Sequence, residues 1–116
     1  MSMEKQARLV EVLIRRTSEG DLDWQTAPVS GVFQLNLSGK GVRLRQSPSE
    51  QGPEILDVVI ELINEDGEIA DSFSDEDLGR EWYRKMNGLY EDARRAALGT
   101  DKLLKETIDE LDEIPF

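Results

Sequence analysis

Hydrophobic and polar residues follow two different periods along this chain, and each period predicts a different type of element. Apolar side chains recur every three or four residues across 3–18, which predicts an amphipathic helix that ends near Gly20. The middle of the chain alternates with a period of two, which is typical of strands with one buried face. The predicted strands are 32–37, 42–46, 55–63 and 68–73.

The segments between these strands have the composition of turns and loops. Ser38–Gly41 and Asn64–Gly67 carry glycine, and the second has the Asp-Gly pair that favours a hairpin. Residues 47–53 contain two prolines and a glycine, so we predict a loop there and expect it to be the most disordered segment. Before the strands, the spacing of Leu22 and Trp24 places both side chains on the inward side.

The last third of the chain returns to helical spacing. Ser74 followed by three acids predicts a helix start, since serine caps free amides and acids favour the positive end of the dipole. An apolar stripe then continues at steps of three and four through 78–97. Gly99 predicts a break, with Thr100 capping a last helix. One long helix kinked near Gly99 is the alternative.

The predicted order α-β-β-β-β-α-α indicates an α+β fold, and residues 1–116 have the length of a single domain. We expect a four-stranded antiparallel meander with the N- and C-terminal helices packed on one face. On the other face, Arg43 and Arg45 would lie near Asp57 and Glu61, which places opposite charges on neighbouring strands.

The composition excludes most of the catalytic and metal-binding chemistry that can be recognised from a sequence. The chain has no histidine and no cysteine, the usual side chains for proton transfer at neutral pH, nucleophilic attack and transition-metal binding. The acidic turn at Asn64–Glu68 does not match a calcium loop, because Leu62 stands where the first ligand belongs. We predict no catalytic residue, no metal site and no cofactor. A small-molecule or metal-dependent enzyme is the least favoured function.

Charge limits the partners. The chain has 25 acidic and 14 basic residues, a formal net charge of −11, which disfavours direct binding to nucleic acid or to anionic membranes. No segment approaches the length of a membrane-spanning helix, and the first residues lack the apolar run of a signal peptide. Together with the absence of cysteine, this predicts a cytoplasmic protein.

Two regions are candidates for an interaction surface. Three apolar residues fall on the outer sheet face beside two arginines, although scattered edge residues are an equal explanation. At the C-terminal end, acidic residues oppose the helix dipole and therefore lack a structural reason, and the final residue either docks back or engages a partner. The candidate residues are Arg43, Arg45, Ile55, Val59, Ile63, Glu106, Asp109, Glu110, Asp112, Glu113 and Phe116.

Three short motifs occur in order: Thr17-x-x-Gly20-x-Leu22-x-Trp24, Asp66-Gly67-x-Ile69, and Leu89-Tyr90-x-x-Ala93-Arg94-Arg95. In this order the chain resembles a group of small bacterial domains that share these motifs. The resemblance covers most of the chain and implies the α+β fold and a bacterial cytosolic setting. It implies no activity.

The sequence therefore favours a non-enzymatic, acidic protein–protein interaction module: an adaptor, an inhibitor or an accessory protein. Its partner is a protein of unknown identity, and a homodimer is possible. The alternative is an acidic inhibitor that mimics nucleic acid and occupies a basic protein surface, which predicts binding that weakens with salt.

Overall fold

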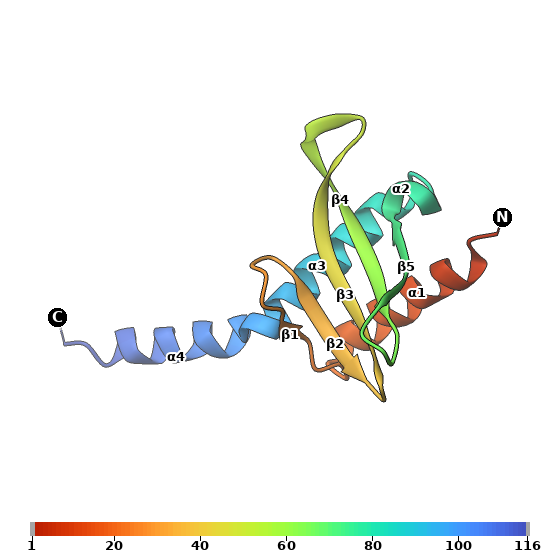
Figure 1. The fold of residues 1–116 in the computed structure, drawn as a ribbon. Helices are drawn as coiled ribbons and strands as arrows, with labels where there is room; N and C mark the ends of the chain where they lie inside the picture. The colour runs from red at the N-terminus through yellow and green to blue at the C-terminus, as the bar shows by residue number, and fades with distance from the viewer. Residues whose placement is uncertain (1, 116) are drawn as a thin grey trace.

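The computed structural model describes residues 2–115, with Pro53 described by its backbone alone, and has an α+β fold around one antiparallel sheet (Figure 1). The predicted meander is confirmed, because each strand pairs with its neighbour in sequence. The predicted number of four strands is wrong, since a two-residue strand precedes them and is too short to show alternation. The strands are β1 (Gln25–Thr26), β2 (Phe33–Leu37), β3 (Lys40–Ser49), β4 (Gly52–Ile63) and β5 (Ile69–Ser74).

The hairpin between β3 and β4 is longer than its prolines predict. The predicted loop at 47–53 is wrong: both strands continue into it, and only Glu50 and Gln51 remain as the turn. Pro48 lies where the register with β4 shifts, beyond the part of β3 that pairs with β2. An irregular position with a free edge tolerates proline, because the missing N–H has no partner to lose.

Two glycines separate the three helices that follow the sheet. Helix α1 (Glu4–Ser18) confirms the first prediction, but the stripe predicted as one helix from Ser74 is two, α2 (Asp75–Leu78) and α3 (Trp82–Leu98). Gly79, with φ of 119°, ends α2 in a conformation that side chains disfavour. The predicted break at Gly99 is confirmed by its φ of 63°. Helix α4 (Thr100–Asp112) follows, without the predicted side-chain cap from Thr100.

The core lies between the sheet and two helices, α1 and α3. Val10 and Leu13 of α1 and Met86 of α3 are buried together with Leu44 and Ile60 of the sheet. Alternate strand positions supply the sheet's side of this core, as the period of two predicts. The other buried members of the cluster are Trp24, Phe33, Leu35, Val42, Val58, Phe73, Leu89, Tyr90 and Ala93.

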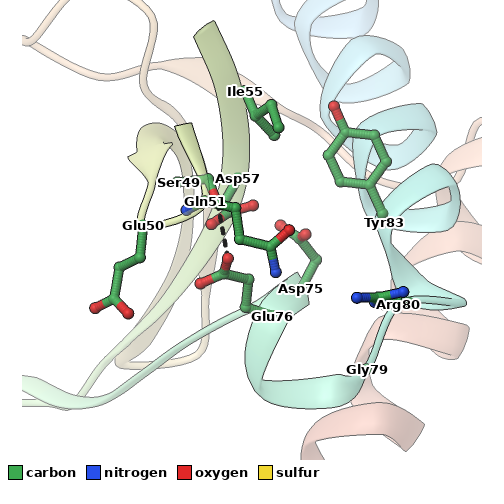
Figure 2. Close-up of a pocket in the computed structure, with 10 residues that line it drawn as sticks. All are labelled: Ser49, Glu50, Gln51, Ile55, Asp57, Asp75, Glu76, Gly79, Arg80 and Tyr83. Carbon is green, nitrogen blue, oxygen red and sulfur yellow. Dashed lines mark hydrogen bonds between the residues drawn. The ribbon is translucent and has the colours of Figure 1, made fainter. Parts of the chain in front are cut away.

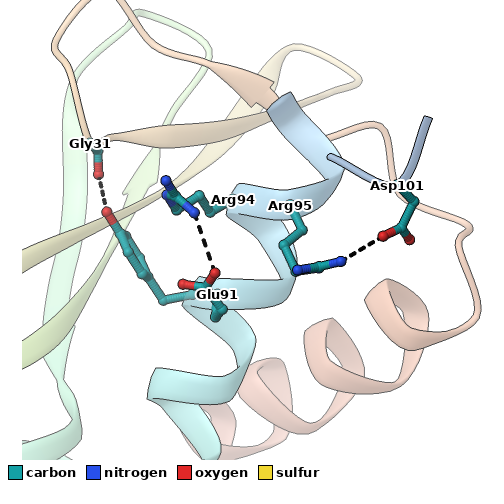
Figure 3. Close-up of polar contacts among 6 residues, drawn as sticks. Gly31, Glu91, Arg94, Arg95 and Asp101 are labelled. Atoms are coloured by element: carbon teal, nitrogen blue, oxygen red, sulfur yellow. Dashed lines mark hydrogen bonds and ion pairs between the residues drawn. The ribbon is translucent and has the colours of Figure 1, made fainter. Parts of the chain in front are cut away.

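Helix α4 does not join this core. The prediction that all terminal helices pack on one face is wrong for α4, which projects away from the sheet (Figure 1) and has no buried residue. Gly99 turns the chain through the left-handed region, and Arg95 of α3 forms an ion pair with Asp101 of α4 across it (Figure 3). The exit of the chain from the body is therefore fixed by local geometry rather than by packing.

Two hydrogen bonds from buried aromatic residues fix the segment around β1. Trp24 Nε1 donates to Oγ1 of Thr17 at the end of α1, over 3.0 Å, so both ends of the Thr17–Trp24 motif are joined. Tyr90 donates its hydroxyl proton to the carbonyl of Gly31 (Figure 3), and its ring contacts Phe33 with centroids 5.4 Å apart. These contacts give Thr17, Trp24 and Tyr90 structural roles.

Candidate functional site

Helix α4 exposes an apolar stripe that the other described residues leave uncovered. We define the α4 stripe as Leu103, Leu104, Ile108 and Leu111, whose exposed fractions lie between 51% and 60%. Leu98 before it and Ile114 after it are also exposed, at 48% each. Contiguous apolar surface of this kind is typical of protein interfaces.

Acidic side chains occupy much of the remaining surface of α4. The candidate residues Glu106, Asp109, Glu110, Asp112 and Glu113 are all exposed, whereas Phe116 lies outside the described residues. Residues 100–114 contain six acids and two lysines, a net charge of −4. The last turn of α4 carries no basic residue, and the acids from Asp109 onward stand at the negative end of the helix dipole.

The sheet face predicted as an interaction surface offers less apolar area. Val59 is only 8% exposed, and Ile63 is half-buried on the same strand. The predicted proximity of Arg43 and Arg45 to acids on the next strand is found for Glu61. Arg45 Nε lies 3.4 Å from Glu61 Oε2, and Arg43 stands opposite Glu61 in the register. The sheet residues and the acidic residues of α4 lie apart, because α4 projects away from the sheet (Figure 1).

Asp57 and Ile55 do not join that sheet surface. They line a pocket, which we name the carboxylate pocket. It has a volume of about 890 Å³ and lies where β5 ends and α2 begins, beside the β3–β4 hairpin (Figure 2). Its walls come from the hairpin, from α2 and the segment after it, and from the first turn of α3. The lining residues are Ser49, Glu50, Gln51, Ile55, Asp57, Asp75, Glu76, Gly79, Arg80 and Tyr83.

Asp75 has a structural role at the edge of β4. Strand β5 stops at Ser74, opposite Val59, so β4 continues without a neighbour on that side. The N–H of Val58, the next residue along that edge, donates to Asp75 Oδ1 over 2.7 Å. Asp75 is 3% exposed and supplies the acceptor that a longer β5 would have supplied.

Asp57 has no comparable partner. It is 6% exposed, yet among residues 2–115 no backbone N–H donates to it, and the nearby Ser49 hydroxyl gives its proton to Glu76 over 2.7 Å. Burial, then the charges of Asp75 and Glu76 and a side-chain hydrogen bond with Asp75, raise the pKa of Asp57 to about 6, against a smaller lowering by a hydrogen bond with Ser49. Asp57 is one of the residues that line the pocket.

Sequence patterns did not predict this pocket. Asp57 lies in an alternating strand, where the pattern predicts a solvated side chain, and Asp75 has an ordinary role at a helix start. The available signal is that an acid interrupts the apolar run 55–63, which we interpreted as a cross-strand ion pair. Its actual neighbours come from a helix start that only the three-dimensional fold brings close.

The predicted turn at 64–67 is confirmed and has a structural explanation. Asn64 Oδ1 accepts hydrogen bonds from the N–H groups of Asp66 and Glu68, so the side chain closes the hairpin. Over the described part of the chain, no three acidic side chains are grouped to hold a metal ion. None of the helices between residues 2 and 115 is long and apolar enough to cross a membrane. Comparison of the chain with protein-family models, curated proteins and solved structures finds no match.

Proposed function

We propose that this protein is a non-enzymatic interaction module that docks α4 into an apolar groove with a basic rim on a partner protein. One observation carries the proposal: α4 is amphipathic over 13 residues and none of them is buried. An isolated helix of this length is marginal in water, because its few hydrogen bonds hardly offset nucleation. Docking of the stripe supplies the packing that the body of the protein does not supply.

The energetics suit a reversible complex. Full burial of one leucine or isoleucine side chain is worth about 1.5–3 kcal/mol, and the four residues of the stripe are already about half covered. Association costs at least several kcal/mol in lost freedom of motion. The stripe therefore supports modest affinity by itself, and charges around it add to the encounter rate and to specificity.

Charge favours a basic partner over a second copy of this chain. Two copies that meet through α4 bring two sets of acids together, each set with a net charge of −4, in chains that each carry −11. Like charges across an interface oppose association, whereas a basic rim also relieves the unfavourable acids at the end of the helix. The partner that fits is a protein with an apolar groove flanked by lysine or arginine.

The test uses two designed helical peptides with the same leucine stripe, one flanked by lysines and one by glutamates. We expect the lysine-flanked peptide to bind the protein, and the glutamate-flanked peptide to bind at least tenfold more weakly, because it repeats the charge of α4. The variant Leu104→Lys/Ile108→Lys should lose binding. The matched control Glu106→Gln/Glu113→Gln changes the charge by the same amount on the opposite side and should lose only a few-fold at low salt.

Other outcomes identify a different occupant of the stripe or a different role for its charge. Equal binding of both peptides removes the charge argument. A wild-type dimer that the stripe variant converts to a monomer makes a second copy the occupant. The nucleic-acid mimic is supported instead if the stripe variant still binds the lysine-flanked peptide, the acid-neutralised control does not, and DNA competes with the peptide. A protein captured from a native lysate counts in favour when the stripe variant loses it and the control retains it.

A further inference from the structure

The carboxylate pocket carries an uneven charge. Four acids line it, Glu50, Asp57, Asp75 and Glu76, against one basic side chain, Arg80. Asp75 and Glu76 have hydrogen-bond donors within the protein, Val58 N–H and the Ser49 hydroxyl. These acids alone do not define a site, because folded proteins also use carboxylates to satisfy sheet edges and turns.

Asp57 is the second and independent feature. Its side chain is more than nine-tenths buried and opens into the pocket, and over residues 2–115 no backbone N–H compensates its charge. A carboxylate that is buried beside two other acids costs free energy when it is charged, and a partner that brings positive charge and N–H groups lowers that cost. Figure 2 shows Asp57 beside Asp75 and Glu76, with Arg80 on the other side of Asp75.

The other wall of the pocket is apolar and aromatic. Ile55 and Tyr83 line it, Tyr83 is 40% exposed, and Figure 2 shows the two side chains on the same side of the pocket. Small-molecule sites combine such walls with a few fixed polar groups in cavities of a few hundred to about 1,000 Å³. The carboxylate pocket, at about 890 Å³, is within this range.

We propose that the carboxylate pocket binds an organic cation, an alkylammonium or guanidinium group on a short carbon chain. The cation lies against Asp57 and Glu76, and its carbon chain lies against Ile55 and Tyr83. N–H donors of the ligand replace those that Asp57 lacks, and such hydrogen bonds between ions are the strong ones. A metal ion fits less well, because the described residues hold no group of three acidic ligands.

The same chemistry has two sources, a free amine or an arginine or lysine side chain of a partner. Agmatine is the probe for the first, since it carries a guanidinium and an ammonium group on four carbons. An arginine residue blocked at both ends is the probe for the second. Binding of each to the full chain is measured by calorimetry at low salt, with magnesium chloride as a third probe.

We expect agmatine to bind the wild-type chain, and Asp57→Asn to weaken this binding at least tenfold, since it replaces a charged hydrogen-bond acceptor with a neutral one. Asp57→Asn is expected to fold, because it removes repulsion from Asp75 and Glu76. Arg80→Gln is the opposite control: it removes the competing positive charge, and binding should tighten a few-fold. Asp92→Asn, an exposed change on α3, should leave binding unchanged.

The dependence on pH separates this site from general attraction to an acidic protein. Asp57 gains charge as the pH rises through about 6, so agmatine should bind more tightly at pH 7.5 than at pH 5.5, and this gain should vanish in Asp57→Asn. The groups that face Asp57 are Asp75 and Glu76 of α2, Glu50 and Ser49 of the hairpin, and Arg80 and Tyr83 after α2.

Several results overturn the proposal. Agmatine affinity that is the same in Asp57→Asn, or weaker in Arg80→Gln, shows that the cation is not held in this pocket. Magnesium that binds in its place, with the same variant pattern, makes the site a metal site. Binding of the blocked arginine but not of agmatine assigns the pocket to a partner's side chain and retains the cation chemistry.

Discussion

Arg95 Nη2 lies 2.6 Å from Asp101 Oδ1, and this ion pair spans the left-handed residue Gly99 between α3 and α4 (Figure 3). Asp101 is 87% exposed and Arg95 is 43% exposed, so the pair is screened by water and contributes little to stability. Its importance is geometric, because it acts together with Gly99 at the point where the chain leaves the body. Helix α4 is thus directed away from the core by two local features.

The first prediction compares two leucines on either side of Gly99. Leu89 is 2% exposed in the core, so Leu89→Ala should lower the free energy of unfolding by about 2–5 kcal/mol. Leu104 is 51% exposed on α4, so Leu104→Ala should change it by less than about 0.5 kcal/mol. Urea denaturation of both variants measures this, and a cost above about 1.5 kcal/mol at Leu104 would show that α4 packs against the body in solution.

The second prediction concerns the hydroxyl of Tyr90, which donates to the Gly31 carbonyl. Tyr90→Phe removes this hydrogen bond and keeps the ring contact with Phe33, so stability should fall by about 1 kcal/mol. Tyr83→Phe on the same helix is the matched control and should cost little, because Tyr83 is 40% exposed. Equal losses in the two variants would mean that the Tyr90 hydroxyl adds nothing.

Periodicity predicted most of the fold because burial follows it closely. The alternation around Leu44 and Ile60 and the helical spacing around Val10 correspond to buried positions, and the predicted strands and first helix are all present. Composition was a weaker guide: prolines at 47–53 predicted a loop, but the free edge of β3 accommodates Pro48 within a strand. The stripe after Ser74 predicted one helix, since its apolar positions continue in phase across Gly79.

The candidate site was predictable only where it is local in sequence. The acids at the end of α4 conflict with the helix dipole, and that conflict is visible in the sequence alone. The meeting of Asp57 with Asp75 depends on β5 ending at Ser74 while β4 continues, which is a matter of strand length and register. Hydrophobic patterns fix which face a strand buries, but they do not fix where its neighbour ends.

The third prediction tests the sheet edge at Asp75. Both Asp75→Asn and Asp75→Ala remove its charge, but asparagine keeps an oxygen that can accept the proton of Val58 N–H. Alanine leaves this buried N–H unpaired, so Asp75→Ala should be less stable than Asp75→Asn by about 1–3 kcal/mol. Hydrogen exchange at Val58 should be faster in the alanine variant alone. Identical stability and exchange in both variants would show that Asp75 does not act as the acceptor.

The fourth prediction follows from the pKa of Asp57, raised from 3.8 to about 6 chiefly by burial and then by Asp75 and Glu76. A carboxyl with a raised pKa in the folded state holds its proton more tightly there than in the unfolded chain. It therefore destabilises the fold progressively as the pH rises from about 4 to about 6, and fully above that. Asp57→Asn removes this penalty and adds an amide that can donate to Asp75.

Urea denaturation between pH 4 and pH 8 measures the effect. At pH 7.5 we expect Asp57→Asn to be more stable than the wild type by on the order of 1–3 kcal/mol, with the difference shrinking toward pH 4. Asp92→Asn makes the same charge change on the exposed side of α3 and should show no such pH-dependent gain. A difference that stays constant across this range would mean that the pKa of Asp57 is not raised in the folded state, and the pH arm of the cation proposal would then fail independently of agmatine binding.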